Sequence, residues 1–279
     1  MASHAFQQVD VFTTLAFKGN PLAVVLDAGD LSDHQMAAIA NWSNLSETTF
    51  LVAPTNPSAD YGVRIFTPER ELPFAGHPTL GSCHVWLAAG HSPKGEHVVQ
   101  ECGAGLVRIR REGHRLAFAA PPLRRSGDVA ADLLARLALG LRVEAASIKA
   151  SQWIDNGPGW VAVMLASRAE ILALRPDFQV LAPLPVGVVA PWAGETDGTD
   201  ANFEVRAFIT SRSSEDPVTG SLNAGLGQWL IGSGGAPDRY IACQGTVLGR
   251  AGRVHVERAG TDVWVGGETV TCIEGKINV

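Results

Sequence analysis

The chain has 279 residues, of which 46% are hydrophobic, and its formal net charge is −6. This length and apolar content predict one or two compact domains with a substantial core. The acidic balance, with only four lysines and no long basic run, gives no electrostatic footprint for nucleic acid, so no nucleic-acid partner is expected.

The N-terminus and the cysteines indicate a cytoplasmic protein. Residues 1–10 lack a basic stretch followed by an apolar run, so no signal peptide is expected. The most apolar segment, 180–194, holds three prolines and is too short to span a bilayer as a helix; it is expected to be loop and short strand, and no membrane partner is expected. The cysteines lie far apart without paired spacing, which favours reduced thiols over disulfides or structural zinc: Cys83, Cys102, Cys243 and Cys272.

The first half of the chain opens with a hairpin signal, since the alternating residues 6–12 are followed by Gly19-Asn20-Pro21 and a strand over 22–26. Ser32 and Gln35 have the spacing of a capping box, which predicts a helix reaching Trp42. Strands are expected around 47–51 and 61–66, a helix from about Pro78 to Gly90, and three short strands over 97–119.

Pro121-Pro122 is the predicted domain boundary, and the second half repeats the plan of the first. The expected elements are a helix over 130–139, a strand over 160–163, a helix over 219–231 and short strands over 239–278. Strands come in groups and helices are few, so the predicted class is α+β.

The most informative feature is an internal repeat. Glu71, Pro73 and Gly76 recur as Glu215, Pro217 and Gly220 at one constant offset, and 63–66 matches 205–208 at an offset two residues smaller. Two duplicated halves, each with a glycine turn at a helix start, can place two helix N-termini opposite one another across a shared cleft. Such a cleft suits an anion and a catalytic site.

The residues at these turns also have structural interpretations. Asp216-Pro217 is suited to an N-cap followed by a first helical residue. His77 occupies the matching place but is a poor capping residue, so its presence is less structural. Gly76 and Gly220 allow the backbone to approach a ligand closely or simply form a tight turn.

Glu47 stands at the polar beginning of a strand, and spacing alone predicts a solvated strand end for it. His84 shares a helix face with His77, but no third ligand has a compatible spacing, so no metal site is expected. The string 157–162 fits a dinucleotide fingerprint but precedes a strand and not a helix. With every lysine outside the motifs as well, no cofactor is expected.

Three motifs, taken together, resemble the PhzF-like family of phenazine biosynthesis: 44–50 (NLSETTF), 73–79 (PFAGHPT) and 215–221 (EDPVTGS). The resemblance implies a fold like that of diaminopimelate epimerase, with two pseudo-symmetric domains, each a β-barrel-like sheet around a central helix, and the active site between them. Domain one would span 1–120 and take back a C-terminal segment from about 268 to 279, and domain two would span 121–267. A homodimer is also implied.

The same resemblance implies a cofactor-independent isomerase or epimerase that moves a proton on a small carboxylate-bearing metabolite. Glu47 would be the single acid/base, with His77 and Asp216 as further catalytic residues. The implied substrate-binding residues are Asn20, Gly76, Gly220 and Ser221.

Alternatives to this function stay open at the level of sequence. Racemisation by two thiols is disfavoured, because neither 71–79 nor 213–223 contains a cysteine. A catalytically silent ligand-binding protein of the same fold is one alternative. A hydrolase using Ser221, His77 and Asp216 is a weaker one, because no Gly-x-Ser-x-Gly elbow surrounds the serine.

Overall fold

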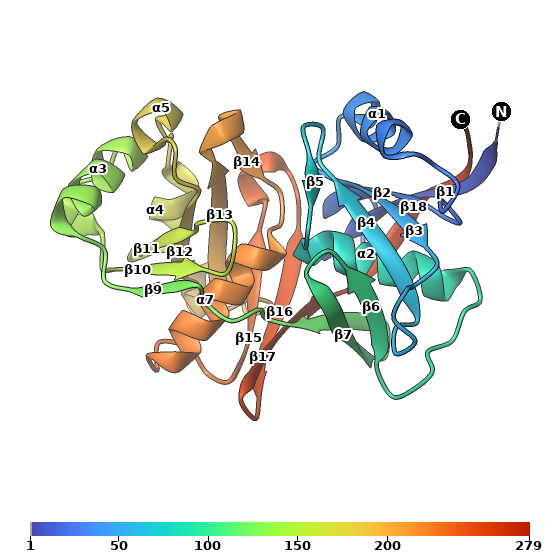
Figure 1. The fold of residues 1–279 in the computed structure, drawn as a ribbon. Coiled ribbons are helices and arrows are strands. Elements are labelled where there is room, and N and C mark those ends of the chain that lie inside the picture. The colour runs from blue at the N-terminus through green and yellow to red at the C-terminus, as the bar shows by residue number, and fades with distance from the viewer. Residues whose placement is uncertain (1) are drawn as a thin grey trace. The chain divides into compact units, whose positions relative to one another are not determined.

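A computed structural model describes residues 2–279 and shows a mixed α/β protein with many strands and few helices (Figure 1). The chain forms two compact units. Unit 1 holds the residues up to Ala119 together with Gly266–Val279, and unit 2 is Ala120–Val265. The coarse fold class agrees with the sequence-based prediction, whereas a pseudo-symmetric relation between the units stays a prediction.

Unit 1 is a sheet with two helices. Its strands are β1 (Ser3–Val11), β2 (Asn20–Val25), β3 (Thr48–Val52), β4 (Tyr61–Phe66), β5 (Glu71–Leu72), β6 (Val98–Cys102), β7 (Gly105–Glu112), β8 (Arg115–Ala119) and β18 (Thr269–Asn278), and its helices are α1 (Asp33–Ser43) and α2 (Gly76–Ala88). The strands pair in the order β18-β1-β2-β3-β4-β6-β7-β8, with β5 also against β4. The pairs β2–β3 and β4–β6 are parallel and the others antiparallel.

The central helix of unit 1 is α2, which packs against β1, β2, β3, β6, β8 and β18. Ten of its 13 residues are buried, among them the polar His77, Thr79 and Ser82. Gly81 permits the close approach to the sheet, because a Cβ there would lie 2.5 Å from Leu22 Cδ2. The other helix, α1, begins at the predicted capping box, in which Ser32 and Gln35 bond reciprocally.

Unit 2 has its own sheet and five helices within the described residues. The strands are β9 (Arg125–Gly127), β10 (Ala150–Asp155), β11 (Val161–Met164), β12 (Val186–Pro191), β13 (Phe203–Ile209), β14 (Ser214–Asp216), β15 (Arg239–Gln244), β16 (Gly252–Ala259) and, at the end of the unit, β17 (Asp262–Gly267). The helices are α3 (Ala131–Leu141), α4 (Arg168–Ala173), α5 (Phe178–Leu181), α6 (Gly194–Asp197) and α7 (Gly220–Gly232).

The strand order in unit 2 is β9-β10-β11-β12-β13-β15-β16, with β14 also against β13. The pairs β11–β12 and β13–β15 are parallel. Its apolar helix α7 packs against β10 and β16 and is buried at ten of 13 positions. The short helices α4, α5 and α6 were not predicted, because four to six residues are too few to show helical periodicity.

The sequence repeat is matched by a repeated contact. Arg64 of β4 binds Glu71 of β5 through two hydrogen bonds of 2.8 and 2.7 Å. In unit 2, Arg206 of β13 binds Glu215 of β14 in the same two-pronged way, at 3.0 and 2.7 Å. Each pair holds a short strand that leads into the central helix of its unit. These matched pairs support an internal duplication, which stays a prediction.

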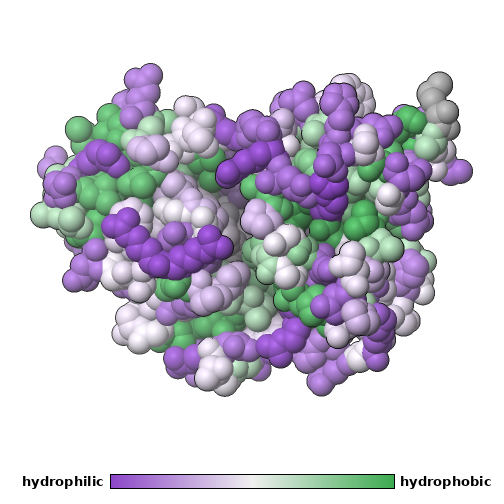
Figure 2. Space-filling view, in the orientation of Figure 1, coloured by the Kyte–Doolittle hydropathy of each residue, from purple (hydrophilic) through white to green (hydrophobic). Residues whose placement is uncertain are grey.

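The surface combines polar and apolar side chains. Figure 2 shows hydrophilic residues over the visible face of both units, with hydrophobic areas between them. Leu15, Phe17, Trp42 and Leu139 are each at least 60% exposed. Among residues 2–279, no helix combines the length and the apolar character that crossing a bilayer requires.

Replacing Gly225 of α7 by alanine is predicted to lower the free energy of unfolding by about 1–3 kcal/mol. The new Cβ would lie 2.5 Å from the carbonyl oxygen of Ile154, so helix or strand must shift. Gly232→Ala is the matched control, since nothing lies within 4 Å of that position on the same helix. Urea denaturation followed by circular dichroism compares the two, and equal stabilities would contradict the prediction.

Candidate functional site

Three of the predicted site residues meet in unit 1. Glu47 directly precedes β3, Asn20 begins β2 and His77 is the second residue of α2. His77 Nε2 lies 3.4 Å from Glu47 Oε2, and His77 Nδ1 lies 3.4 Å from Asn20 Nδ2. The parallel pairing of β2 with β3 brings the two strand ends together over the start of α2. The imidazole is thus flanked by the amide and the carboxyl group.

Burial sets the protonation state of His77 in this cluster. The side chains of Glu47 and His77 are only 16% and 6% exposed, so the expectation of a solvated strand end from spacing alone was wrong. Burial lowers the pKa of His77 to about 3, against an opposing hydrogen bond to the backbone of Pro21. The imidazole is therefore neutral near pH 7, and its contact with Glu47 is not an ion pair.

Hydroxyl groups fix the strand on which Glu47 stands. Thr48 and Ser43 of α1 are joined through their hydroxyl oxygens at 3.0 Å. Ser82 of α2 donates to Thr49 Oγ1 at 2.9 Å. The first two residues of β3 are thereby tied to both helices of the unit. Sequence reasoning missed these contacts, because threonine in a strand is ordinary.

The start of α2 lies next to this cluster and has the character of an anion site. Gly76 is the first helical residue and Ala75 the N-cap, so the described structure provides no side-chain hydrogen bond to cap the helix. Helix starts carry backbone N–H groups without intrahelical partners and a partial positive charge. An oxygen anion from a ligand satisfies both needs.

Unit 2 contains the remaining predicted site residues, but not in the expected arrangement. Asp216 is the last residue of β14 and pairs with Ala207, whereas α7 begins at Gly220 with Thr219 as its N-cap. The interpretation of Asp216 as N-cap was therefore wrong, because strand pairing extends through it. The Thr219 hydroxyl donates a short hydrogen bond to the Asp216 carboxylate.

A buried glutamine holds this turn. Gln244 Oε1 accepts from the backbone N–H of Thr219 at 3.0 Å and from Asn223 Nδ2 at 2.9 Å. Its Nε2 donates to the Asp216 carbonyl at 3.1 Å and to Thr219 Oγ1 at 3.0 Å. Gln244 and Asn223 are fully buried, so all these groups need partners inside the protein. The carboxylate of Asp216 is fixed through Thr219 by this network.

The internal repeat of the sequence extends to Gln244, which was not among the predicted site residues. Gln100 and Thr79 stand at the same offset from Gln244 and Asn223 as Glu71 does from Glu215 (144 residues: 244 − 100, 223 − 79 and 215 − 71). In unit 1, Gln100 Nε2 likewise donates to Thr79 of the central helix, at 3.1 Å.

Ser221 has fixed partners within unit 2. Its hydroxyl oxygen accepts from the Trp160 indole at 3.0 Å, and its carbonyl accepts from Asn156 Nδ2 at 2.8 Å. A hydroxyl group that accepts one hydrogen bond retains its proton for donation. This geometry suits a substrate-binding group beside Gly220, the first residue of α7.

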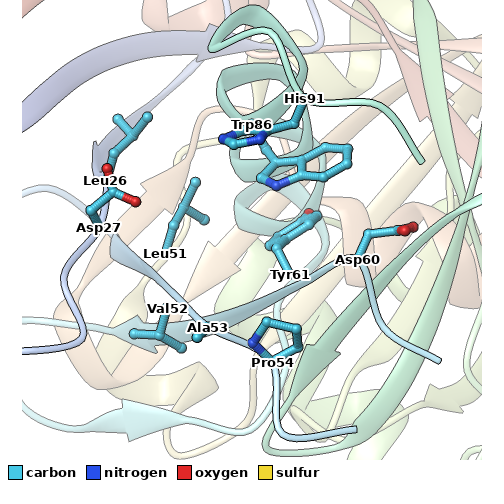
Figure 3. A pocket seen from close by; sticks show the side chains of 10 residues that line it. All are labelled: Leu26, Asp27, Leu51, Val52, Ala53, Pro54, Asp60, Tyr61, Trp86 and His91. Carbon is cyan, nitrogen blue, oxygen red and sulfur yellow. The ribbon is translucent and has the colours of Figure 1, made fainter. Parts of the chain in front are cut away.

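A separate hollow of about 240 Å³ lies in unit 1 and is drawn in Figure 3. The Trp86 indole stacks there between Tyr61 and His91, with ring centroids 5.3 and 5.2 Å away. The predicted site residues are not among its lining side chains. Within residues 2–279, no group of three or more His, Cys, Asp and Glu side chains is arranged to hold a metal ion.

The pKa of His77 makes a prediction about acid stability. Its folded value of about 3 lies below the ordinary 6.5, so the unfolded chain binds one more proton between these pH values. The free energy of unfolding is therefore expected to fall by up to about 1.4 kcal/mol per pH unit from this residue as the pH drops from 6 to 4. Urea titrations at several pH values compare the wild type with His77→Gln. Parallel pH dependences would contradict the prediction.

Gln244→Leu is predicted to lower the free energy of unfolding by about 3 kcal/mol, because it leaves several buried polar groups in unit 2 without partners. Gln179→Leu, at an exposed position of α5, is the control and should change stability by less than about 0.5 kcal/mol. Thermal and urea unfolding measure both variants. A loss for Gln244→Leu no greater than for the control would show that Gln244 does not hold this turn.

Comparison with known proteins places the chain in a family. The family model described as phenazine biosynthesis-like protein (PhzC-PhzF) matches residues 9–275. The trans-2,3-dihydro-3-hydroxyanthranilate isomerase of Pseudomonas aeruginosa is 33% identical, with 97% of this chain and 94% of that protein covered. Antisense-enhancing sequence 1 of Schizosaccharomyces pombe is 38% identical, with 99% of each chain covered.

A solved structure of the PhzF family from Enterococcus faecalis superimposes with a TM-score of 0.83 at 26% identity, and the match covers 100% of both chains. The predicted resemblance is thus confirmed over nearly the whole sequence. The chain belongs to the phenazine biosynthesis-like (PhzF) family of isomerases.

Proposed function

We propose that the protein is a cofactor-independent isomerase in which Glu47 takes a proton from one carbon of a small carboxylate-bearing substrate and returns it to another. The observation that supports this most directly is the buried contact between Glu47 and the neutral His77 at the start of α2. A carboxyl group held this way is placed for proton transfer, and the helix start beside it is suited to an anion.

The proposed chemistry needs both the carboxyl group of Glu47 and the start of α2. Removal of a proton next to a carboxylate or a conjugated alkene builds negative charge on the substrate. Backbone N–H groups at Gly76 and the partial positive charge of α2 stabilise that charge as it develops. Glu47 holds the proton meanwhile, and Asn20 and His77 keep its surroundings fixed. One base then suffices for removal and return on the same face of the substrate.

The cysteines support a carboxyl base over thiols. Burial raises the pKa of Cys83 to about 12 and that of Cys243 to about 11. Neither thiol is ionised near neutral pH, and a thiol must be ionised to act as a base or a nucleophile.

From unit 2, we assign Asp216 to the catalytic residues and Gly220 and Ser221 to substrate binding. This rests on the family motif and on the fixed carboxylate and hydroxyl positions within that unit. The named relatives make trans-2,3-dihydro-3-hydroxyanthranilate the first compound to assay. A cytoplasmic homodimer is the expected state of the enzyme.

Glu47→Gln is predicted to lower proton transfer at least about 100-fold, because an amide cannot exchange a proton as a carboxyl group does. The measurement is deuterium incorporation from D₂O, followed by NMR and mass spectrometry over a panel of cyclic and amino-acid carboxylates. Glu195→Gln, an exposed carboxyl on α6, is the control and should retain full activity. Circular dichroism confirms that both variants fold.

Unchanged deuterium uptake in Glu47→Gln would remove this residue from the mechanism. A ligand that binds wild type and Glu47→Gln equally, with no proton exchange in either, would instead favour a silent binding protein of the same fold. Labelling of Ser221 by a fluorophosphonate would favour the hydrolase alternative.

A further inference from the structure

The last strand of unit 1, β18, is unusually exposed for a ten-residue strand. It pairs with β1 along one edge, from Thr269↔Val11 to Asn278↔Ser3. None of its ten side chains is buried, and Ile273 is 50% exposed. Among the described residues no second strand runs along its opposite edge. Backbone donors and acceptors on such an edge are a template for another strand.

Residues 273–278 carry charged side chains, one of the features that protect an edge, but lack two others. They contain no proline, and their register with β1 is regular, since the one irregularity falls between Gln8 and Val9. The two charged side chains, Glu274 and Lys276, face the uncharged Gln7 and Ala5 on β1. Both charges therefore have no opposite charge across the strand within this sheet.

We propose that β18 pairs antiparallel with β18 of a second copy of the chain, centred on Gly275. In this register Glu274 of one copy lies opposite Lys276 of the other, twice by symmetry. Opposite charges directly across an antiparallel pair stabilise it, whereas like charges destabilise it. A shift that places Glu274 opposite itself, or Lys276 opposite itself, sets like charges together. The charges therefore select one register.

The apolar residues favour the same register. Ile273 and Ile277 lie on one face of β18, and Ile277 packs against a core cluster that includes Met36 and Phe66. Centring the pair on Gly275 sets the exposed Ile273 of one copy beside the half-buried Ile277 of the other. Two apolar pairs and two ion pairs thus form together. Gly275 itself has nothing within 4 Å of a built Cβ, so the approach is open.

The proposed isomerase chemistry does not depend on this surface. The family resemblance leads to the expectation of a homodimer but does not say where the copies meet, whereas the charges and exposure of β18 name one strand and one register.

The test is sedimentation velocity of the full chain over a concentration series reaching about 100 μM, where a micromolar Kd gives mostly dimer. Lys276→Glu and Glu274→Lys are each expected to weaken the dimer at least about tenfold, because each places like charges opposite one another twice. Mixing the two variants should restore dimers, since both pairs of opposite charges return. Lys149→Glu, an exposed lysine of unit 2, changes net charge equally and should leave the dimer intact.

A second measurement reads the register. Gly275→Cys is expected to cross-link to its own counterpart on mild oxidation, because residues opposite themselves in an antiparallel pair are within disulfide reach. Oxidised wild type controls for the native thiols. A monomeric wild type would overturn the proposal and leave the edge to a different extended peptide. A dimer that survives both charge reversals unchanged would overturn it as well.

Discussion

The structure depends on two buried helices that begin without a capping side chain. Both central helices, α2 and α7, lie largely buried within their units, and for neither do the described residues provide a side-chain hydrogen bond at the N-cap. Backbone N–H groups at a buried helix start are costly to leave without partners. A glycine at the first position of each helix lacks a side chain that would block a ligand oxygen from these groups.

Keeping such a start in place requires support from elsewhere in each unit. The two-pronged Arg64–Glu71 and Arg206–Glu215 pairs hold the short strands that lead into the helices. In each unit a buried glutamine on a neighbouring strand then binds the start of the helix. Gln244 bonds both the backbone N–H and the hydroxyl of Thr219 in unit 2, and Gln100 bonds Thr79 in unit 1. The helix start is thereby fixed by side chains of neighbouring strands, and in unit 2 Gln244 also accepts from the backbone N–H of Thr219.

The sequence predicted the regular elements well, because their signals are local. The capping box at Ser32, the hairpin of β1 and β2 and the two glycine-led helices need only a few adjacent residues. The burial of Glu47 could not be predicted from the sequence, because it results from the parallel pairing of β2 with β3 and not from its neighbours in sequence. The N-cap interpretation of Asp216 failed for the same reason, because pairing with Ala207 continues the strand.

The neutrality of His77 connects this architecture to the chemistry. A protonated imidazole 3.4 Å from Glu47 would stabilise the carboxylate and oppose its protonation, since a pKa shift of one unit corresponds to about 1.4 kcal/mol. An acid/base that must both take and return a proton needs its two forms close in free energy. Burial that keeps the imidazole uncharged removes this bias while the ring stays 3.4 Å from the carboxyl group. In the proposed function, a single glutamate serves both directions of transfer without a second base.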